Sequence, residues 1–93
     1  MADSLNSLGD AVHALGDPSK AVELLGRALA IKESAYGEDH VITAYTLMGL
    51  GDACCDLGDT AKARDFLERA ITIFERANNR NAGRCRNKLN SLT

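Results

Sequence analysis

The residues best suited to metal binding or covalent chemistry in this sequence are Cys54, Cys55, Cys85, His13 and His40. No pair of them has the Cys-x-x-Cys or His-x-x-x-His spacing of a zinc site, and adjacent cysteines on a helix point about 100° apart. We therefore expect no bound metal and no cofactor. An odd number of cysteines, two of them adjacent, favours reduced thiols in a cytoplasmic protein over a disulfide framework.

Catalysis by a cysteine needs a base within hydrogen-bond reach and a third group that orients the base. His13 and Cys55 are the pair to consider, because they are related by the 42-residue offset of an internal repeat. Equivalent positions on neighbouring helices lie about 10 Å apart, which is too far for a direct hydrogen bond. The sequence also lacks a glycine-rich phosphate loop. We therefore predict that the protein is not an enzyme.

The elements that carry these residues occur twice. Residues 15–31 read LGDPSKAVELLGRALAI and residues 57–73 read LGDTAKARDFLERAITI, with nine of the seventeen aligned positions identical. A match this dense at one fixed offset indicates a repeat architecture.

Apolar spacing and capping residues predict an all-α chain with five helices, over residues 3–15, 18–35, 40–57, 60–77 and 80–92. Gly16 and Gly58 tolerate the left-handed backbone that ends a helix. Asp17 and Asp59 can accept hydrogen bonds from the free amides that begin the next one. The turns at residues 15–17 and 57–59 are only Leu-Gly-Asp, and turns this short join neighbouring helices that run antiparallel.

The core is expected to come from residues at repeat-equivalent positions. Gly9 and Gly51 occupy matching points, where the lack of a side chain lets a neighbouring helix approach closely. The first helix carries an apolar stripe of Leu5, Leu8, Val12 and Leu15. The second helix should bury Ala21, Leu24, Leu25, Ala28 and Ile31, and the fourth should bury Ala63, Phe66, Leu67, Ala70, Ile73 and Phe74.

The charge of the chain is divided unevenly. Residues 1–75 carry thirteen acids and six bases (−7), and residues 76–93 carry five bases and no acid (+5), which together give the net charge of −2. The basic end could meet nucleic acid, an acidic partner or another copy. It lacks the interleaved aromatic residues of a nucleic-acid binder, although Arg80, Arg84, Arg86 and Lys88 leave that alternative open. No apolar run reaches the roughly 18–20 residues needed to cross a bilayer, so we expect no membrane contact.

The repeated residues resemble those of a tetratricopeptide repeat (TPR) protein. The first helix of a TPR has a large residue, Leu-Gly and a second large residue, and its second helix has a small, a large and a small residue. Here these are Leu47, Leu50-Gly51 and Cys54, followed by Ala63, Leu67 and Ala70. The usual period is about 34 residues. The longer period here, with the turn YGEDH at 36–40, is similar to the repeats of kinesin light chains and nephrocystin-like proteins.

The resemblance implies a right-handed α-solenoid of antiparallel helix pairs, with about two and a half repeats. It divides a single domain, residues 1–93, into a first repeat (1–37), a second repeat (38–79) and a C-terminal capping helix with a polar outer face (80–93).

The resemblance also implies a protein–protein interaction or scaffold module that binds a peptide or partner segment. The first, third and fifth helices would line a concave face. The family's groove positions fall on Asp3, Asn6, Asp10, His13, Tyr45, Met48, Asp52, Cys55, Asn87 and Asn90. The alternative is a self-assembling structural fragment that forms homo-oligomers through the exposed ends of the solenoid.

Overall fold

The fold consists of helices joined by short connections. The computed structural model describes residues 2–92, with side chains from residue 4 to residue 92. Within that part of the chain there are five helices: α1 (Ala2–Ala14), α2 (Pro18–Tyr36), α3 (Val41–Leu57), α4 (Thr60–Arg76) and α5 (Asn81–Asn90). Each observed boundary lies within two residues of the predicted one, so the all-α prediction is confirmed.

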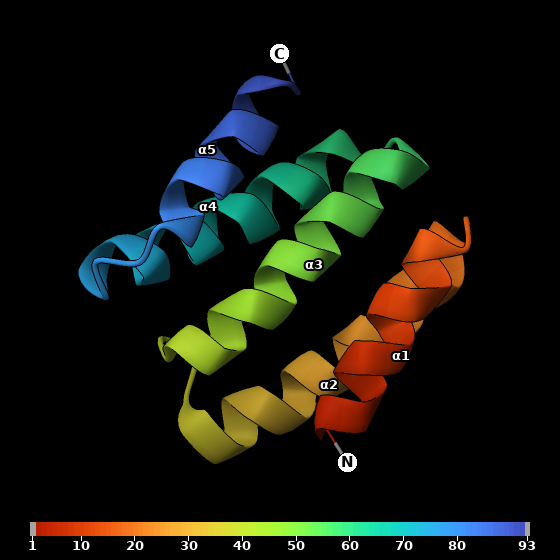
Figure 1. Ribbon diagram of the computed structural model, residues 1–93, viewed down its shortest axis with the longest axis horizontal. Helices are drawn as coiled ribbons and strands as arrows, with labels where there is room; N and C mark the ends of the chain where they lie inside the picture. Colours follow the sequence, from red (N-terminus) through yellow and green to blue (C-terminus); the bar gives the residue numbers. More distant parts are fainter. Residues whose placement is uncertain (1, 93) are drawn as a thin grey trace.

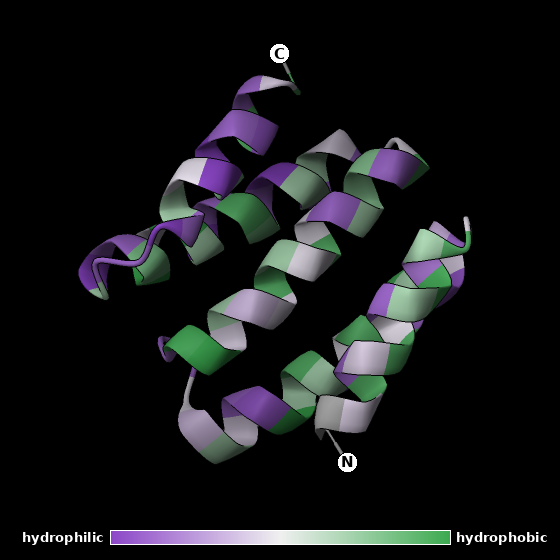
Figure 2. Cartoon of the chain, viewed as in Figure 1, coloured by the Kyte–Doolittle hydropathy of each residue, from purple (hydrophilic) through white to green (hydrophobic). Residues whose placement is uncertain are grey.

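The helices stack in chain order. Each helix packs against the next, and α1 also contacts α3. In Figure 1, α1 crosses in front of α2 and α5 crosses in front of α4, so that α1, α3 and α5 share one face, which we call the α1–α3–α5 face. Figure 2 shows that α5 is largely hydrophilic, as predicted for the last helix. The arrangement is the α-solenoid of antiparallel helix pairs expected from the sequence.

The two Leu-Gly-Asp turns share one geometry. Gly16 and Gly58 have φ values of +94° and +80°, which side chains with a Cβ rarely adopt. The Asp17 carboxylate accepts a hydrogen bond from the Lys20 amide at 3.1 Å, and the Asp59 carboxylate accepts one from the Lys62 amide at 3.2 Å. Both turns therefore end one helix and cap the next as the repeat predicts.

The two matching glycines lie where the helices of one pair approach each other closely. A Cβ on Gly9 would lie 2.8 Å from Cγ of Leu25, and a Cβ on Gly51 would lie 2.7 Å from Cγ of Leu67. Both leucines are fully buried. The close approach predicted from the sequence is confirmed in both repeats, and these contacts form part of a continuous core that includes Ala21, Leu25, Leu47, Leu50, Leu67, Ala70 and Phe74.

Equivalent residues of the two repeats differ in burial at the start of the stack. The prediction that Ile31 is buried is wrong: its side chain is 37% exposed, whereas its equivalent Ile73 is 3% exposed. Likewise Leu8 is 51% exposed and its equivalent Leu50 is 1% exposed. For Leu8 the reason is position, because α3 packs against α2 and contacts α1, whereas no helix within residues 2–92 precedes α1 and covers its outer side.

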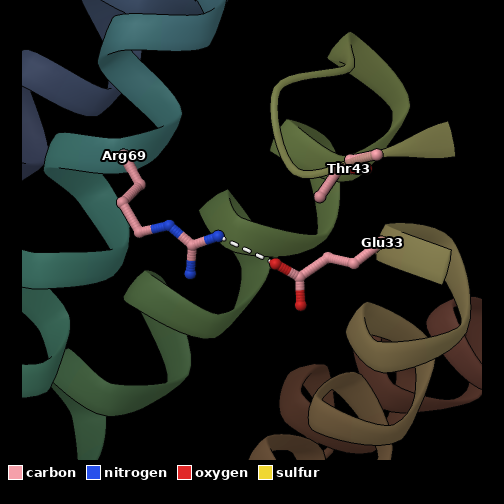
Figure 3. A network of polar contacts seen from close by, with 4 residues as sticks. Glu33, Thr43 and Arg69 are labelled. Atoms are coloured by element: carbon pink, nitrogen blue, oxygen red, sulfur yellow. Dashed lines mark hydrogen bonds and ion pairs between the residues drawn. The ribbon is translucent and has the colours of Figure 1, made fainter.

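On the side of the stack opposite the α1–α3–α5 face, a polar contact joins α2 and α4. The Arg69 guanidinium of α4 donates to the Glu33 carboxylate of α2 at 3.0 Å (Figure 3). Near this contact, the buried Thr43 hydroxyl donates to the Gly37 carbonyl at 2.9 Å and fixes the start of α3 against the preceding loop. The division of the chain into repeats at 37/38 and 79/80 stays a prediction.

Candidate functional site

Polar side chains from α1 and α3 meet on the α1–α3–α5 face. The buried Thr46 hydroxyl donates to the Asn6 side-chain carbonyl at 2.7 Å, and the Asn6 amide donates to Asp10 at 3.2 Å. Asp10 also approaches α3, because a Cβ on Gly49 would lie 3.3 Å from its carboxylate. Two predicted site residues, Asn6 and Asp10, therefore join α1 to α3. The side chain of the predicted residue Asp3 lies outside the described part of the chain.

His13 forms a second link between these helices. Its Nε2 atom lies 2.5 Å from the Asp56 carboxylate, near the C-terminal ends of α1 and α3. The repeat offset pairs His13 with Cys55, and the structure pairs it with the next residue. Asp56 was not among the predicted site residues, although its carboxylate is adjacent to the position that is repeat-equivalent to His13.

A hollow of about 430 Å³ lies between α3 and α5. It brings together three predicted groove residues, Met48, Asp52 and Asn87, with four that were not among the predicted groove positions: Arg84, Cys85, Lys88 and Ser91. The hollow offers a thioether, a carboxylate, an amide, a hydroxyl and two cationic groups within one small volume. Such a set can hydrogen-bond to main-chain amides and carbonyls and can contact one apolar side chain.

Asp52 lies where charges from three helices converge. Burial raises the pKa of Asp52, against the opposing effect of Lys88, His13 and Arg84, which favour the carboxylate. Burial also raises the pKa of Asp10, opposed by His13 and Lys32. The face is therefore acidic along α1 and α3 and basic along α5.

Tyr45 and Asn90 lie apart from this cluster. The half-exposed Tyr45 accepts hydrogen bonds from the Asn79 and Asn81 side chains, each at 3.4 Å, and its ring packs edge-on against Phe74 at 5.3 Å between centroids. Tyr45 thus holds the loop between α4 and α5. Asn90 lines a different hollow, between α4 and α5, beside Ile71, Thr72 and Leu89.

The basic residues of the C-terminal segment divide between different surfaces. Arg84 and Lys88 line the hollow between α3 and α5. Arg86 instead pairs with Glu75 of α4, and Arg76 pairs with Asp39 at 3.9 Å. The described residues therefore do not gather these cations into one patch of the kind that the nucleic-acid alternative requires.

The cysteines show no sign of activation. Burial raises the pKa of Cys54 and Cys55, and it raises the pKa of Cys85 to about 11. These thiols are therefore protonated at neutral pH, whereas a nucleophilic cysteine needs a lowered pKa. Among the described residues, no group of three or more His, Cys, Asp or Glu side chains is placed to hold a metal ion. No helix within that part of the chain is both long and apolar enough to cross a membrane.

Comparison with known proteins supplies one match. The family model described as tetratricopeptide repeat matches residues 1–76, which include α1 to α4 and end before α5. No curated protein matches the chain.

Proposed function

Because this chain belongs to the tetratricopeptide repeat family, whose repeats are typically non-catalytic modules for protein–protein interaction, we propose that it binds an extended peptide segment of a partner protein on the α1–α3–α5 face. The observation that carries the proposal is the hollow between α3 and α5, where Met48, Asp52 and Asn87 lie together with Lys88. It is the part of the face where side chains of two helices surround open space.

An extended peptide suits this surface because its main-chain amides and carbonyls need polar partners. The Asp52 carboxylate can accept from a peptide amide, and the Asn87 side chain can both donate and accept. Met48 offers a flexible apolar contact that adapts to different side chains. Along α1, Asn6 and Asp10 already bond to each other or to α3, so we propose that they shape the edge of the groove and contribute less to affinity.

The experiment selects peptides from a random library on the immobilised chain and measures the best binders by isothermal titration calorimetry. Asp52→Ala and Asn87→Ala are each expected to weaken binding about tenfold, which corresponds to about 1.4 kcal/mol. Asn90→Ala is the matched control: it is the same substitution on the same helix, three residues away, in the hollow beside Ile71. It should leave the affinity unchanged.

Two results would overturn the proposal. One is that no peptide binds the chain in the selection. The other is that Asn90→Ala weakens the selected peptides while Asp52→Ala and Asn87→Ala do not, which would move the site to the surface between α4 and α5.

A further inference from the structure

The charged residues of the three helices that form the α1–α3–α5 face are separated by sign. α1 contains two aspartates and no Lys or Arg, and the same is true of α3, so each carries −2. α5 contains two arginines, one lysine and no acid, and carries +3. The other two helices mix their charges, because α2 has three bases and two acids and α4 has four bases and three acids, so each carries +1. Separation by sign is therefore specific to the helices of the proposed peptide-binding face.

Exposed charges of opposite sign lie at the two edges of this face. α3 lies between α1 and α5 (Figure 1), so α1 and α5 form the edges. Asp10 of α1 is exposed, and so is Arg84 of α5, which lines the hollow. A carboxylate has about four acceptor sites, so the hydrogen bond from Asn6 leaves Asp10 able to accept others. Asp56 and Arg86, by contrast, already form ion pairs within the chain.

We propose that the segment bound on this face carries an acidic side chain over Arg84 and a basic side chain over Asp10. This inference rests on the proposed function, since it names the chemistry of the peptide that the face would bind. A peptide charged with one sign throughout would meet a like charge at one edge of the face, and such contacts reject wrong partners.

The separation of the two charged side chains follows from the spacing of the helices. Neighbouring helices of the face lie about 10 Å apart, so α1 and α5 lie about 20 Å apart. An extended peptide advances about 3.3 Å per residue and therefore crosses this span in about six residues. Side chains of an extended chain alternate in direction, so an even separation turns both charged side chains toward the protein. Either chain direction satisfies this pattern.

Each of the two contacts contributes modestly to affinity. Both are ion pairs between exposed groups, which contribute at most about fivefold each and weaken as salt is added. The contact at α1 should be the weaker of the two, because the charge of Lys32 acts on Asp10 and offsets part of the attraction. The charges therefore select and orient the peptide, whereas the hollow holds it.

Peptides selected from the random library are the probe for this inference, and they should carry opposite charges about six residues apart. Replacing the acidic residue of such a peptide with Gln should weaken binding to the wild type by at most about fivefold. The same replacement should cost nothing against Arg84→Gln, which has already lost the partner charge. Likewise, replacing the basic residue with Gln should weaken binding to the wild type and cost nothing against Asp10→Asn.

The crossed combinations test the orientation of the peptide. Removing the acidic residue should cost the same affinity against Asp10→Asn as against the wild type, because those two charges lie at opposite edges. The matched control is Arg64→Gln, which is the same substitution as Arg84→Gln at an exposed arginine within α4. Against this variant, too, the acidic residue should contribute as it does in the wild type. Circular dichroism checks that all three variants keep their helix content.

The failure of this inference can be told apart from the failure of the proposed function. Selected peptides that depend on Asp52 and Asn87 but lack the two charges would overturn the inference and leave the proposed function standing. The same holds if the acidic residue couples to Asp10, or if it contributes equally to binding of Arg84→Gln and of the wild type. If no peptide binds, the proposed function fails and this inference fails with it.

Discussion

Three glycines inside helices provide a test of how closely the helix pairs pack. Gly51 lies inside α3 and Gly26 inside α2, and both pay the cost of glycine in a helix, which is about 1 kcal/mol relative to alanine. Their surroundings differ. A Cβ on Gly26 would meet nothing within 4 Å, whereas a Cβ on Gly51 would lie 2.7 Å from both Cγ and Cδ2 of Leu67.

The expected effects on stability have opposite signs. Gly26→Ala should raise the free energy of unfolding by about 0.5–1 kcal/mol, since the helix gains and nothing is displaced. Gly51→Ala gains the same contribution to the free energy of unfolding from its helix. It must also displace the fully buried Leu67, and overpacking of this kind costs about 1–3 kcal/mol. Because both variants gain the same helix propensity, the difference between their free energies of unfolding measures the overpacking cost, about 1–3 kcal/mol.

Urea denaturation followed by circular dichroism measures both free energies, and an unchanged m value ensures that the comparison concerns stability. In thermal unfolding, Gly26→Ala should raise Tm by about 4–8 °C per kcal/mol gained. Gly9→Ala, where a Cβ would lie 2.8 Å from Cγ of Leu25, should behave like Gly51→Ala. If Gly51→Ala is as stable as Gly26→Ala, the claim that glycine is required for the approach of α3 and α4 is refuted.

Three further predictions concern the α1–α3–α5 face and the cysteines. Burial raises the pKa of Asp52 above its ordinary value of 3.8, so the free energy of unfolding falls as pH rises through the folded-state pKa. Asp52→Asn should therefore be more stable than the wild type at pH 7. Urea denaturation should show that this difference in the free energy of unfolding disappears below about pH 4. A double-mutant cycle on His13 and Asp56 should give a coupling of about 0–1 kcal/mol that falls with added salt, because the pair is partly exposed. Iodoacetamide followed by peptide mapping should label the half-buried Cys55 first and the buried Cys85, with its pKa of about 11, only when the chain unfolds.

Local chemistry made the turns and the close helix contacts predictable. Gly16 and Gly58 have few alternatives once a helix must end and another begin within three residues, and Asp17 and Asp59 supply the caps. The recurrence of Gly9 and Gly51 at the repeat offset likewise predicted close packing. These features depend on backbone geometry and on the size of one side chain, and both are encoded locally.

Contacts between the repeats could not be derived from the offset alone. Asn6 pairs with Thr46 at a separation of 40 residues, and His13 pairs with Asp56 at a separation of 43, whereas the repeat period is 42. Neighbouring repeats are tilted and shifted, and side chains lean along their helices, so the nearest polar group is seldom the repeat equivalent. The 42-residue offset predicts which helix lies beside a given residue, but it does not predict which residue of that helix is the partner.

The orientation of α5 was also beyond the repeat pattern. The offset from α3 selected Asn87 and Asn90, and the structure places Asn87 and Lys88 beside Asp52 but Asn90 beside Ile71. The loop that leads into α5 contains Asn78 with φ of +55°, and it differs in sequence from the loop that leads into α3. The equivalence with α3 therefore did not predict which residues of α5 lie beside Asp52.

The polar contacts on the two sides of the stack limit how far it can bend. Thr46 with Asn6 and His13 with Asp56 join α1 to α3, whereas Arg69 with Glu33 joins α4 to α2. Opening the α1–α3–α5 face would stretch the first two contacts, and closing it would stretch the third. The contacts on both sides therefore favour one curvature of the first two helix pairs, although each partly exposed ion pair contributes only about 0–1 kcal/mol. A peptide that docked on the α1–α3–α5 face would meet a surface whose curvature is already favoured, so less conformational entropy would be lost in fixing it on binding.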